Sequence, residues 1–239
     1  MEKVIFKDLG KIDYQTAWTF QQDLLAELIE TKRYNRSLGE MDATRKVQQH
    51  YLLFCEHPAV YTLGRRTNPE NLLLDEAGLA ARGVQAHKIN RGGDITFHGE
   101  GQVVGYPIFD LDHFFTDIHK YVRFLEEIII RTLAEYGLAA QRIEGYTGVW
   151  LEDSTAVVPL KKICAIGVHL SRWVTMHGFA LNVNTDLSHF NYIVPCGIQE
   201  ADKTVTSLEK ELGRSVDLME VKQKLKRHFA DCFEFEFTV

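Results

Sequence analysis

The chain has 239 residues, 45% of them hydrophobic and 25% charged, and a formal net charge of −6 at pH 7. This composition is typical of a globular protein that can bury a substantial core, and the negative charge without a dominant basic block argues against nucleic-acid binding. No apolar run approaches the roughly eighteen residues of a membrane span and no signal peptide is recognised, so the sequence predicts a cytoplasmic protein without a membrane partner.

The first third of the chain is predicted to form short strands and two helices. Asp13 is a suitable N-cap for a helix over Tyr14–Lys32, which carries an apolar stripe. The polar stretch Tyr34–Gln49 lacks a clear period and is predicted to be a loop or an insertion. The other segments predicted here are strands over Val4–Phe6, Tyr51–Cys55, Ala59–Leu63 and Val84–Ile89, and a short helix over Asp75–Arg82 that ends at Gly83.

Strands predominate in the remainder of the chain. Asp117 is predicted to cap the longest helix, over Ile118–Tyr136, which stops at Gly137. The segment Asn182–Phe190 is predicted to be irregular. Further strands are predicted over Ile95–Phe97, Val103–Phe109, Leu138–Ile143, Gly148–Leu151, Lys162–Leu170, Met176–Val183 and Tyr192–Val194, with a turn at Pro159, helices over Ser207–Leu212 and Asp217–Ala230, and an edge strand over Phe233–Phe237.

The order of these segments indicates the fold class. Strands outnumber helices and many of them are consecutive, which favours a mixed or antiparallel sheet flanked by helices over a strict βαβ repeat. The sequence shows no internal repeat, low-complexity tract or linker. We therefore predict an α/β (α+β) fold in a single domain over residues 1–239.

Glycine is concentrated in the stretch Arg91–Asp110, which contains five glycines within fifteen residues. A chain uses glycine at this density where φ must be positive or where another group approaches the backbone closely. The segment is predicted to be a strand, a tight glycine turn and a second strand, with Arg91 and His98 at the edges of the turn. This arrangement predicts a backbone-lined slot for a ligand, and the alternative is a glycine-rich hairpin without one.

The glycine turn does not match a nucleotide-binding loop, and no metal-binding motif is found. A G-x-x-x-x-G-K-[ST] motif is absent, and Gly99–Gly105 misses the G-x-G-x-x-G spacing by one residue and leads into a strand. The ten histidines are dispersed, and the four cysteines include no C-x-x-C pair. We therefore expect no metal site and no disulfide framework.

Cys196 is the best candidate for a nucleophile, because Pro195 fixes the entry to its turn and Gly197 leaves the sulfur uncrowded. A thiolate needs a cationic neighbour or a base to form at neutral pH. Lys162, His98 or His177 could supply it if the fold brings them close. The other cysteines, Cys55, Cys164 and Cys232, are expected to be core residues.

Five motifs in order along the chain resemble the bacterial octanoyltransferases, the lipoyl(octanoyl) transferase family of lipoate biosynthesis. They span about residues 57–198 and include the glycine-rich stretch described above. The motifs are H-P-A-V-Y-T-L-G from His57, R-G-G-D-I-T-F-H-G-E-G-Q-V-V-G-Y from Arg91, K-I-C-A-I-G-V from Lys162, M-H-G-F-A-L-N from Met176 and I-V-P-C-G-I from Ile193.

The resemblance implies a fold, a reaction and a set of site residues. The fold is that of the biotin and lipoate protein ligases, a mixed sheet flanked by helices. Cys196 is implied to be the acyl-accepting nucleophile and Lys162 the residue that lowers its pKa and acts as the base. The implied acyl-binding residues are Arg91, Gly92, Gly93, Asp94, Ile95, Thr96, Phe97, His98, Ala165, Ile166, Gly167, Gly178, Phe179 and Ala180.

The resemblance also implies the substrates. The family moves an octanoyl or lipoyl group from acyl carrier protein to a lysine of a lipoyl domain, on 2-oxoacid dehydrogenase subunits or the glycine-cleavage H protein. A thioester donor already carries an activated acyl group, so no ATP and no cofactor are needed. The absence of a phosphate-binding loop is consistent with this reaction.

The sequence departs from the family pattern in two places. Glu100 stands where proline is common, which is expected to make the turn less rigid, and Tyr34–Gln49 is longer than usual. Lys161 adjoins Lys162, and on a strand the two side chains face opposite sides, so only one can reach the cysteine. The alternatives are an ATP-dependent lipoate or octanoate ligase, which needs no nucleophilic cysteine, and a non-catalytic protein that binds an acyl carrier or a lipoyl domain.

Overall fold

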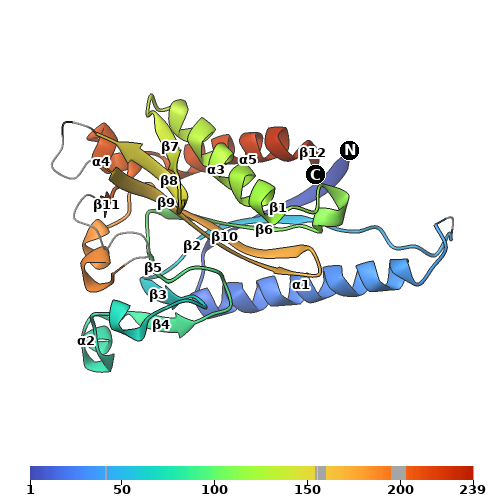
Figure 1. Ribbon diagram of the computed structural model, residues 1–239, viewed down its shortest axis with the longest axis horizontal. Coiled ribbons are helices and arrows are strands. Elements are labelled where there is room, and N and C mark those ends of the chain that lie inside the picture. Colours follow the sequence, from blue (N-terminus) through green and yellow to red (C-terminus); the bar gives the residue numbers. More distant parts are fainter. Residues whose placement is uncertain (41, 154, 156–159, 195–202, 239) are drawn as a thin grey trace.

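The computed structural model describes residues 1–40, 42–153, 155, 160–194 and 203–238. Within these residues the main sheet has the strands β1 Glu2–Lys11, β2 Tyr51–Glu56, β6 Gln102–Ile108, β7 Ala140–Ile143, β8 Tyr146–Glu152, β9 Leu160–Ser171, β10 Val174–Asn182, β11 Lys203–Val205 and β12 Phe235–Thr238. Their order is β12-β1-β2-β6-β10-β9-β8-β7, and β11 also pairs with β9 (Figure 1). β1 runs parallel to β12 and β2, and the pairs from β2 to β7 are antiparallel, so the predicted mixed sheet is confirmed.

A second, three-stranded sheet contains β3 Val60–Leu63, β4 Gln85–Lys88 and β5 Ile95–His98 in the order β4-β3-β5. β5 pairs with β3, whereas β6 pairs with β2 and β10. The glycine turn between β5 and β6 therefore carries the chain from the second sheet to the main sheet, and the plain hairpin is excluded. Gly101 in this turn has a φ of 75°, and a Cβ there would lie 2.5 Å from the Asn184 carbonyl oxygen.

The helices are α1 Tyr14–Arg36, α2 Glu76–Ala81, α3 Ile118–Ala134, α4 Leu208–Leu212 and α5 Leu218–Phe233, with short 3-10 helices η1 Pro69–Asn71, η2 Leu111–His113 and η3 Leu187–Tyr192. Asp13 accepts a hydrogen bond from the Thr16 N–H at 2.9 Å, and Asp117 from the Lys120 N–H at 3.0 Å, so both predicted N-caps are confirmed. α1 has 23 residues and α3 has 17, so the prediction that α3 is the longest helix is wrong.

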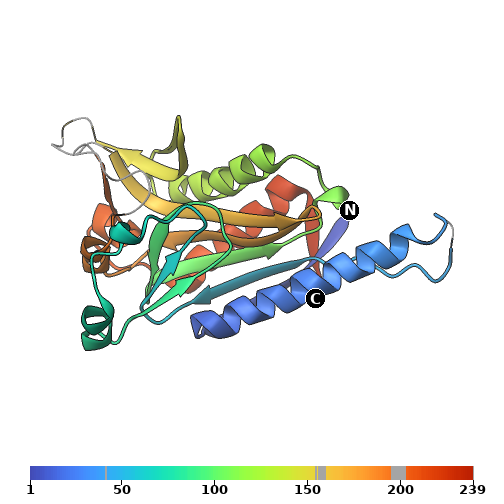
Figure 2. The ribbon, with the colours of Figure 1, turned by 60° about the horizontal axis from the view of Figure 1, so that its bottom comes forward.

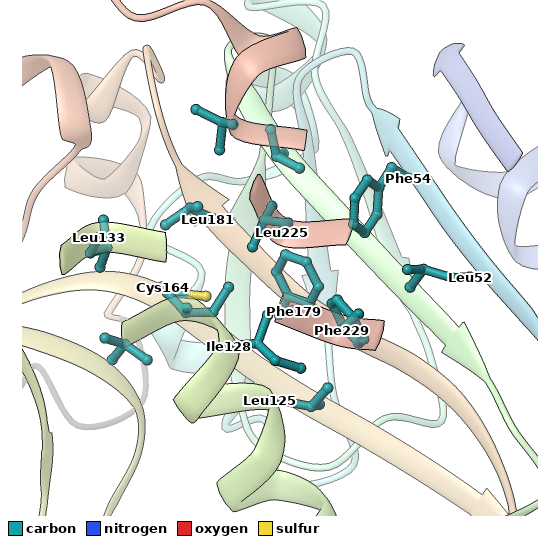
Figure 3. Packing of buried hydrophobic residues seen from close by; sticks show 14 of the residues in the cluster. Leu52, Phe54, Leu125, Ile128, Leu133, Cys164, Phe179, Leu181, Leu225 and Phe229 are labelled. Carbon is teal, nitrogen blue, oxygen red and sulfur yellow. The ribbon is translucent and has the colours of Figure 1, made fainter. Parts of the chain in front are cut away.

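The helices cover the two faces of the main sheet. α3 and α5 lie side by side on one face and α1 crosses the other, with the second sheet beside the start of α1 (Figures 1 and 2). The larger core cluster fills the space under α3 and α5, where Leu125, Phe179 and Phe229 meet (Figure 3). A smaller cluster lies under α1. The layered architecture follows from these two apolar faces of one sheet.

Several local predictions need correction. Tyr192–Val194 is the end of η3 followed by one bridge from Ile193 to Leu72, not a strand, because a three-residue apolar run does not distinguish the two. Asn182–Phe190, which was predicted to be irregular, contains the start of η3. Phe233, which was predicted to begin the edge strand, is the last residue of α5. Cys232 is only half-buried, whereas Cys55 and Cys164 are core residues as predicted.

In the part of the chain that the structure describes, no helix is both long enough and apolar enough to span a lipid bilayer.

Candidate active site

A cavity lies between the main sheet and the second sheet, on the same side of the main sheet as α1. Three neighbouring strands, β6, β10 and β9, form its floor with alternate residues, as the pleat of a sheet requires. We divide this floor into three levels by the register of the strands. The first level holds Gln102 and Asn182, the second Val104, Ala180 and Ala165, and the third Gly178, Gly167 and the adjoining Tyr106.

Lys162 lines the cavity beside the first level. In the pairing of β9 with β8, Val149 lies opposite Cys164 and Trp150 opposite Lys162, so β9 has one extra residue, Ile163. This β-bulge brings Lys162 onto the same face as Ala165, although strict alternation would separate two positions three residues apart. The Lys162 Nζ lies 5.0 Å from the ring centroid of Trp150.

Lys161 points away from the cavity. Its Nζ lies 3.6 Å from Asp153 Oδ2 and 3.5 Å from Glu211 Oε2. The two adjacent lysines therefore have different surroundings. Lys161 makes ion pairs with carboxylates, whereas Lys162 lies between an aromatic ring and the cavity.

The buried Arg91 cross-links the turn before β5, residues 91–93, to the second sheet. Its Nη2 donates to the Thr62 carbonyl at 2.7 Å and to the Thr62 hydroxyl at 3.0 Å, and its Nη1 donates to the Gly92 carbonyl at 3.0 Å. The Gly92 N–H donates to the Val168 carbonyl of β9 at 2.9 Å. The side chain of Arg91 and the backbone of this turn thus hold the two sheets together at one edge of the cavity.

Glu100 lies in the turn that follows β5 and makes a contact outside it. Its carboxylate forms an ion pair with Lys11 of β1. The adjacent Gly101 N–H donates to Glu56 Oε2 at 2.9 Å. Two contacts from outside the turn therefore hold its backbone and the Glu100 side chain, while the lower rigidity expected without proline stays a prediction.

The two histidines considered as bases are both buried and neutral. His98 Nδ1–H donates to Gln102 Oε1 at 2.9 Å, and burial lowers the pKa of His98 to about 3. His177 Nε2–H donates to Asn90 Oδ1 at 2.7 Å, and burial lowers the pKa of His177 to about 3. Neither side chain can supply a cation near neutral pH, and His177 adjoins the third level, away from Lys162.

Most of the predicted acyl-binding residues border this cavity. Gly92 and Phe97 do not: the Phe97 ring stacks on His189 at 4.4 Å beneath the second sheet. Ile166 and Phe179 border it, but their side chains pack in the core on the other face of the main sheet. The predicted residues that line the cavity are Arg91, Gly93, Asp94, Ile95, Thr96, His98, Lys162, Ala165, Ile166, Gly167, Gly178, Phe179 and Ala180.

Sequence reasoning missed other lining residues. Gln102, Val104 and Tyr106 could have been found by applying two-residue alternation to the second strand of the glycine-rich stretch. Tyr14, Thr147, Phe190 and Val205 come from distant parts of the chain and carry no local signal. Asn182 and His177 belong to the fourth motif, and His177 was considered only as a possible base.

Two cysteines can be excluded as nucleophiles. Burial raises the pKa of the Cys55 and Cys164 thiols far above the ordinary value, which keeps both protonated. Cys164 packs in the core between Leu133 and Phe179 (Figure 3). Cys196, the predicted nucleophile, lies outside the described residues.

One group of potential metal ligands occurs among the described residues, Glu2 with His50 and His113. His50 Nδ1 accepts a hydrogen bond from the Asp110 N–H at 3.2 Å, so the proton of the neutral ring is on Nε2. That Nε2 lies 3.4 Å from Glu2 Oε2. A metal-bound histidine has the opposite arrangement, in which the second ring nitrogen donates, so His50 does not fit a metal ligand here. The hydrogen bond within the group joins His113 Nδ1 to Glu2 Oε1 at 3.2 Å.

Comparison with known proteins identifies the family. Residues 13–230 match the model of the lipoyl protein ligase A/B catalytic domain. A lipoate protein ligase from Thermoplasma acidophilum has a similar fold, with a TM-score of 0.68 at 18% identity over 100% of this chain and 86% of that one. A lipoate-protein ligase A solved with ATP gives 0.67 at 18% identity, over 100% and 88%. The chain belongs to the lipoyl protein ligase A/B catalytic family.

The nearer relatives are octanoyltransferases. The enzyme from Flavobacterium johnsoniae is 55% identical over 238 residues, which cover 99% of both chains. The one from Christiangramia forsetii is 53% identical over 236 residues, covering 98% of this chain and 97% of that one. The similarity extends over the whole chain and is not confined to the five motifs. Within its family, this chain is an octanoyltransferase.

Proposed function

We propose that the enzyme transfers an octanoyl group from octanoyl-acyl carrier protein to a specific lysine of a lipoyl domain, through a thioester on Cys196. The acceptors are lipoyl domains of 2-oxoacid dehydrogenase subunits and the glycine-cleavage H protein. Residues 1–239 act as one catalytic unit, and no cofactor takes part.

The main support is the common cavity that Lys162 shares with the chain on both sides of Cys196. Phe190 precedes the cysteine by six residues and Val205 follows it by nine, and both line this cavity. The small and apolar floor residues Val104, Ala165 and Ala180 suit a hydrocarbon tail. An acyl chain on the floor would therefore have its reactive end beside Lys162.

In the first half-reaction, the proton of the Cys196 thiol passes to the amine of Lys162, and the ammonium stabilises the thiolate. The thiolate attacks the thioester carbonyl of the donor. A new carbon–sulfur bond forms to Cys196, the bond to the carrier sulfur breaks, and Lys162 returns the proton to the departing thiolate.

In the second half-reaction, the amine of the acceptor lysine attacks the acyl-cysteine. Its proton passes to the neutral Lys162, the amide bond forms, and the Cys196 thiolate leaves and receives that proton. The same lysine acts as base and then as acid in each half-reaction, so protons and bonds balance over the cycle.

The acyl-enzyme can be tested directly by mass spectrometry. Incubation with octanoyl-acyl carrier protein and no acceptor should add one octanoyl mass to Cys196, and hydroxylamine should remove it. Cys196→Ser should form no such adduct and lose turnover. A Cys196→Ser enzyme that transfers at the normal rate would contradict the mechanism, and a requirement for ATP would move the chain to the ligase class.

The adjacent lysines provide a matched pair of variants. Lys162→Ala should reduce turnover by about 10²–10⁴-fold, the range for loss of a general acid–base group. Lys161→Ala should keep turnover within about twofold, because its ion pairs with Asp153 and Glu211 are only partly buried. The opposite result would mean that Lys161 is the catalytic base.

A further inference from the structure

Two tyrosines that the mechanism does not use line the far end of the cavity. Tyr106 adjoins the third level of the floor, and Tyr14 comes from the first turn of α1. Both are buried, with 3% of their surface exposed. This end is opposite to Lys162 along β9.

The strand register gives the distance along the floor between the tyrosine end of the cavity and the Lys162 end. Each level is two residues from the next, so the first and third levels are about 13 Å apart. An extended eight-carbon chain spans about 9 Å, since seven single bonds of about 1.5 Å run in a zigzag. With its carbonyl beside Lys162, the tail would pass Val104 and Ala180 and end in front of Tyr106.

Tyr106 is held in place by His57, a residue of the first family-like motif that has no role in the chemistry. The His57 Nδ1–H donates to the Ile12 carbonyl at 2.8 Å, so Nε2 accepts the Tyr106 O–H, also at 2.8 Å. His57 is fully buried, and its ring packs edge-on against Tyr14 at 5.2 Å. Burial also lowers the pKa of His57 to about 4, so the ring stays neutral and the contact persists at neutral pH.

We propose that Tyr106, held by its hydrogen bond to His57, closes the acyl cavity and sets the length of the transferred chain at about eight carbons. His57 is a positioning residue, because it acts through Tyr106 and does not border the cavity. The inference rests on the proposed function, since it assumes that the carbonyl of the acyl group reacts beside Lys162.

The test compares kcat/KM for carrier-linked acyl groups of six, eight, ten and twelve carbons. Tyr106→Leu should raise the ratio of decanoyl to octanoyl transfer by about tenfold, as expected for two newly buried methylenes. Tyr61→Leu is the matched control: Tyr61 is also fully buried and its O–H donates to the His189 carbonyl at 2.9 Å, but it does not border the cavity. This control should leave the ratio within about twofold of the wild type.

Substitutions of His57 test the positioning role separately. His57→Leu should broaden the chain-length profile, because the Tyr106 ring loses its fixed orientation. His57→Gln should restore the profile, since its amide oxygen can accept the tyrosine O–H. If His57→Leu and His57→Gln broaden the chain-length profile equally, His57 does not position Tyr106.

A variant in the middle of the floor keeps the proposal testable if Tyr106→Leu does not fold. Ala165→Leu fills the second level and should favour hexanoyl over octanoyl transfer by about tenfold. The proposal is wrong if a folded Tyr106→Leu enzyme, or Ala165→Leu in its place, keeps the wild-type ratios. A wild-type enzyme that transfers no octanoyl group would instead overturn the proposed function.

Discussion

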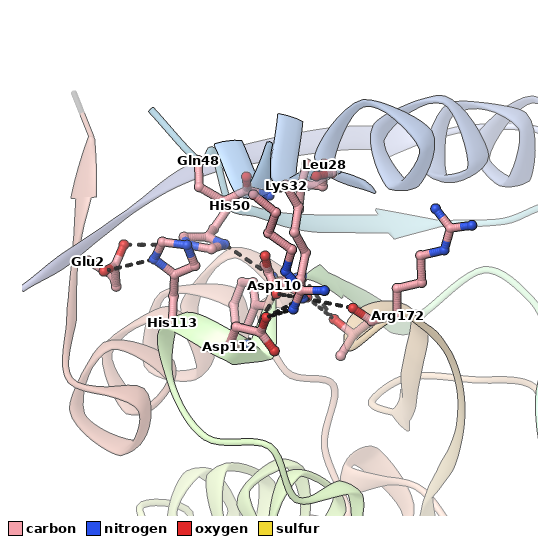
Figure 4. Close-up of polar contacts among 12 residues, drawn as sticks. Glu2, Leu28, Lys32, Gln48, His50, Asp110, Asp112, His113 and Arg172 are labelled. Atoms are coloured by element: carbon pink, nitrogen blue, oxygen red, sulfur yellow. Dashed lines mark hydrogen bonds and ion pairs between the residues drawn. The ribbon is translucent and has the colours of Figure 1, made fainter. Parts of the chain in front are cut away.

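Replacing Lys32 should destabilise the enzyme far more than replacing an exposed lysine. Lys32 lies at the end of α1 with 7% of its side chain exposed, and its Nζ is 2.6 Å from Asp110 Oδ1 and 2.8 Å from Asp112 Oδ2 (Figure 4). It also donates to the Arg172 carbonyl in the β9–β10 turn at 2.8 Å. Lys32→Met would leave the Asp110 carboxylate, which is 1% exposed, without its cation. Removing one partner of a buried ion pair costs about 3–5 kcal/mol.

Urea unfolding of Lys32→Met and Lys11→Met measures this difference. Lys11 pairs with Glu100, and 53% of the Lys11 side chain is exposed, so its replacement should cost about 1 kcal/mol or less. For a chain of this size, the loss at Lys32 corresponds to a melting temperature lower by about 10 °C. Adding Asp110→Asn to Lys32→Met should recover about half of the loss, because no unpaired buried charge remains. Equal losses at Lys32 and Lys11 would refute the argument.

Two further predictions concern acid and the floor of the cavity. Burial holds the pKa of four folded histidines at about 3–4, whereas a histidine of the unfolded chain titrates near pH 6.5; the four are His50, His57, His98 and His177. Because the unfolded chain then binds more protons, the free energy of unfolding should fall as the pH drops from about 6.5 toward 4. A urea midpoint at pH 5 equal to that at pH 7.5 would contradict this prediction. Gly178→Ala would place a Cβ 2.2 Å from the Gly105 carbonyl oxygen, which should cost about 1–3 kcal/mol and reduce octanoyl transfer, whereas Gly39→Ala, with no neighbour within 4 Å, should do neither.

Features with a local signal were predictable from the sequence. The caps Asp13 and Asp117 mark where their helices begin, and Gly137 follows the end of α3 with a φ of 78°. The antiparallel pair β9–β10 was predicted as adjacent strands. These signals are short-range, because a cap or a turn is decided by residues a few positions apart.

The features that shape the cavity depend on long-range pairing instead. The residues around His57 do not show that β2 and β3 belong to different sheets, and the residues around Gly99 do not show this for β5 and β6. Alternation predicts that Lys161 and Lys162 face opposite ways but cannot tell which of them faces the cavity, because the extra residue in β9 is defined only against β8. The hydrogen bond from Tyr106 to His57 likewise joins residues 49 positions apart.

The bulge at Ile163 lets Lys162 and Ala165 share one face of the sheet although three positions separate them. Deleting this one buried residue would leave Lys162 two positions before Ala165, so regular alternation alone would keep Lys162 on the cavity face and Lys161 outside it. Regular pairing of β9 with β8 that kept all the residues would instead turn Lys162 away from the cavity. The direction of the lysine side chain therefore depends on the bulge and on the number of residues between Lys162 and Ala165 together.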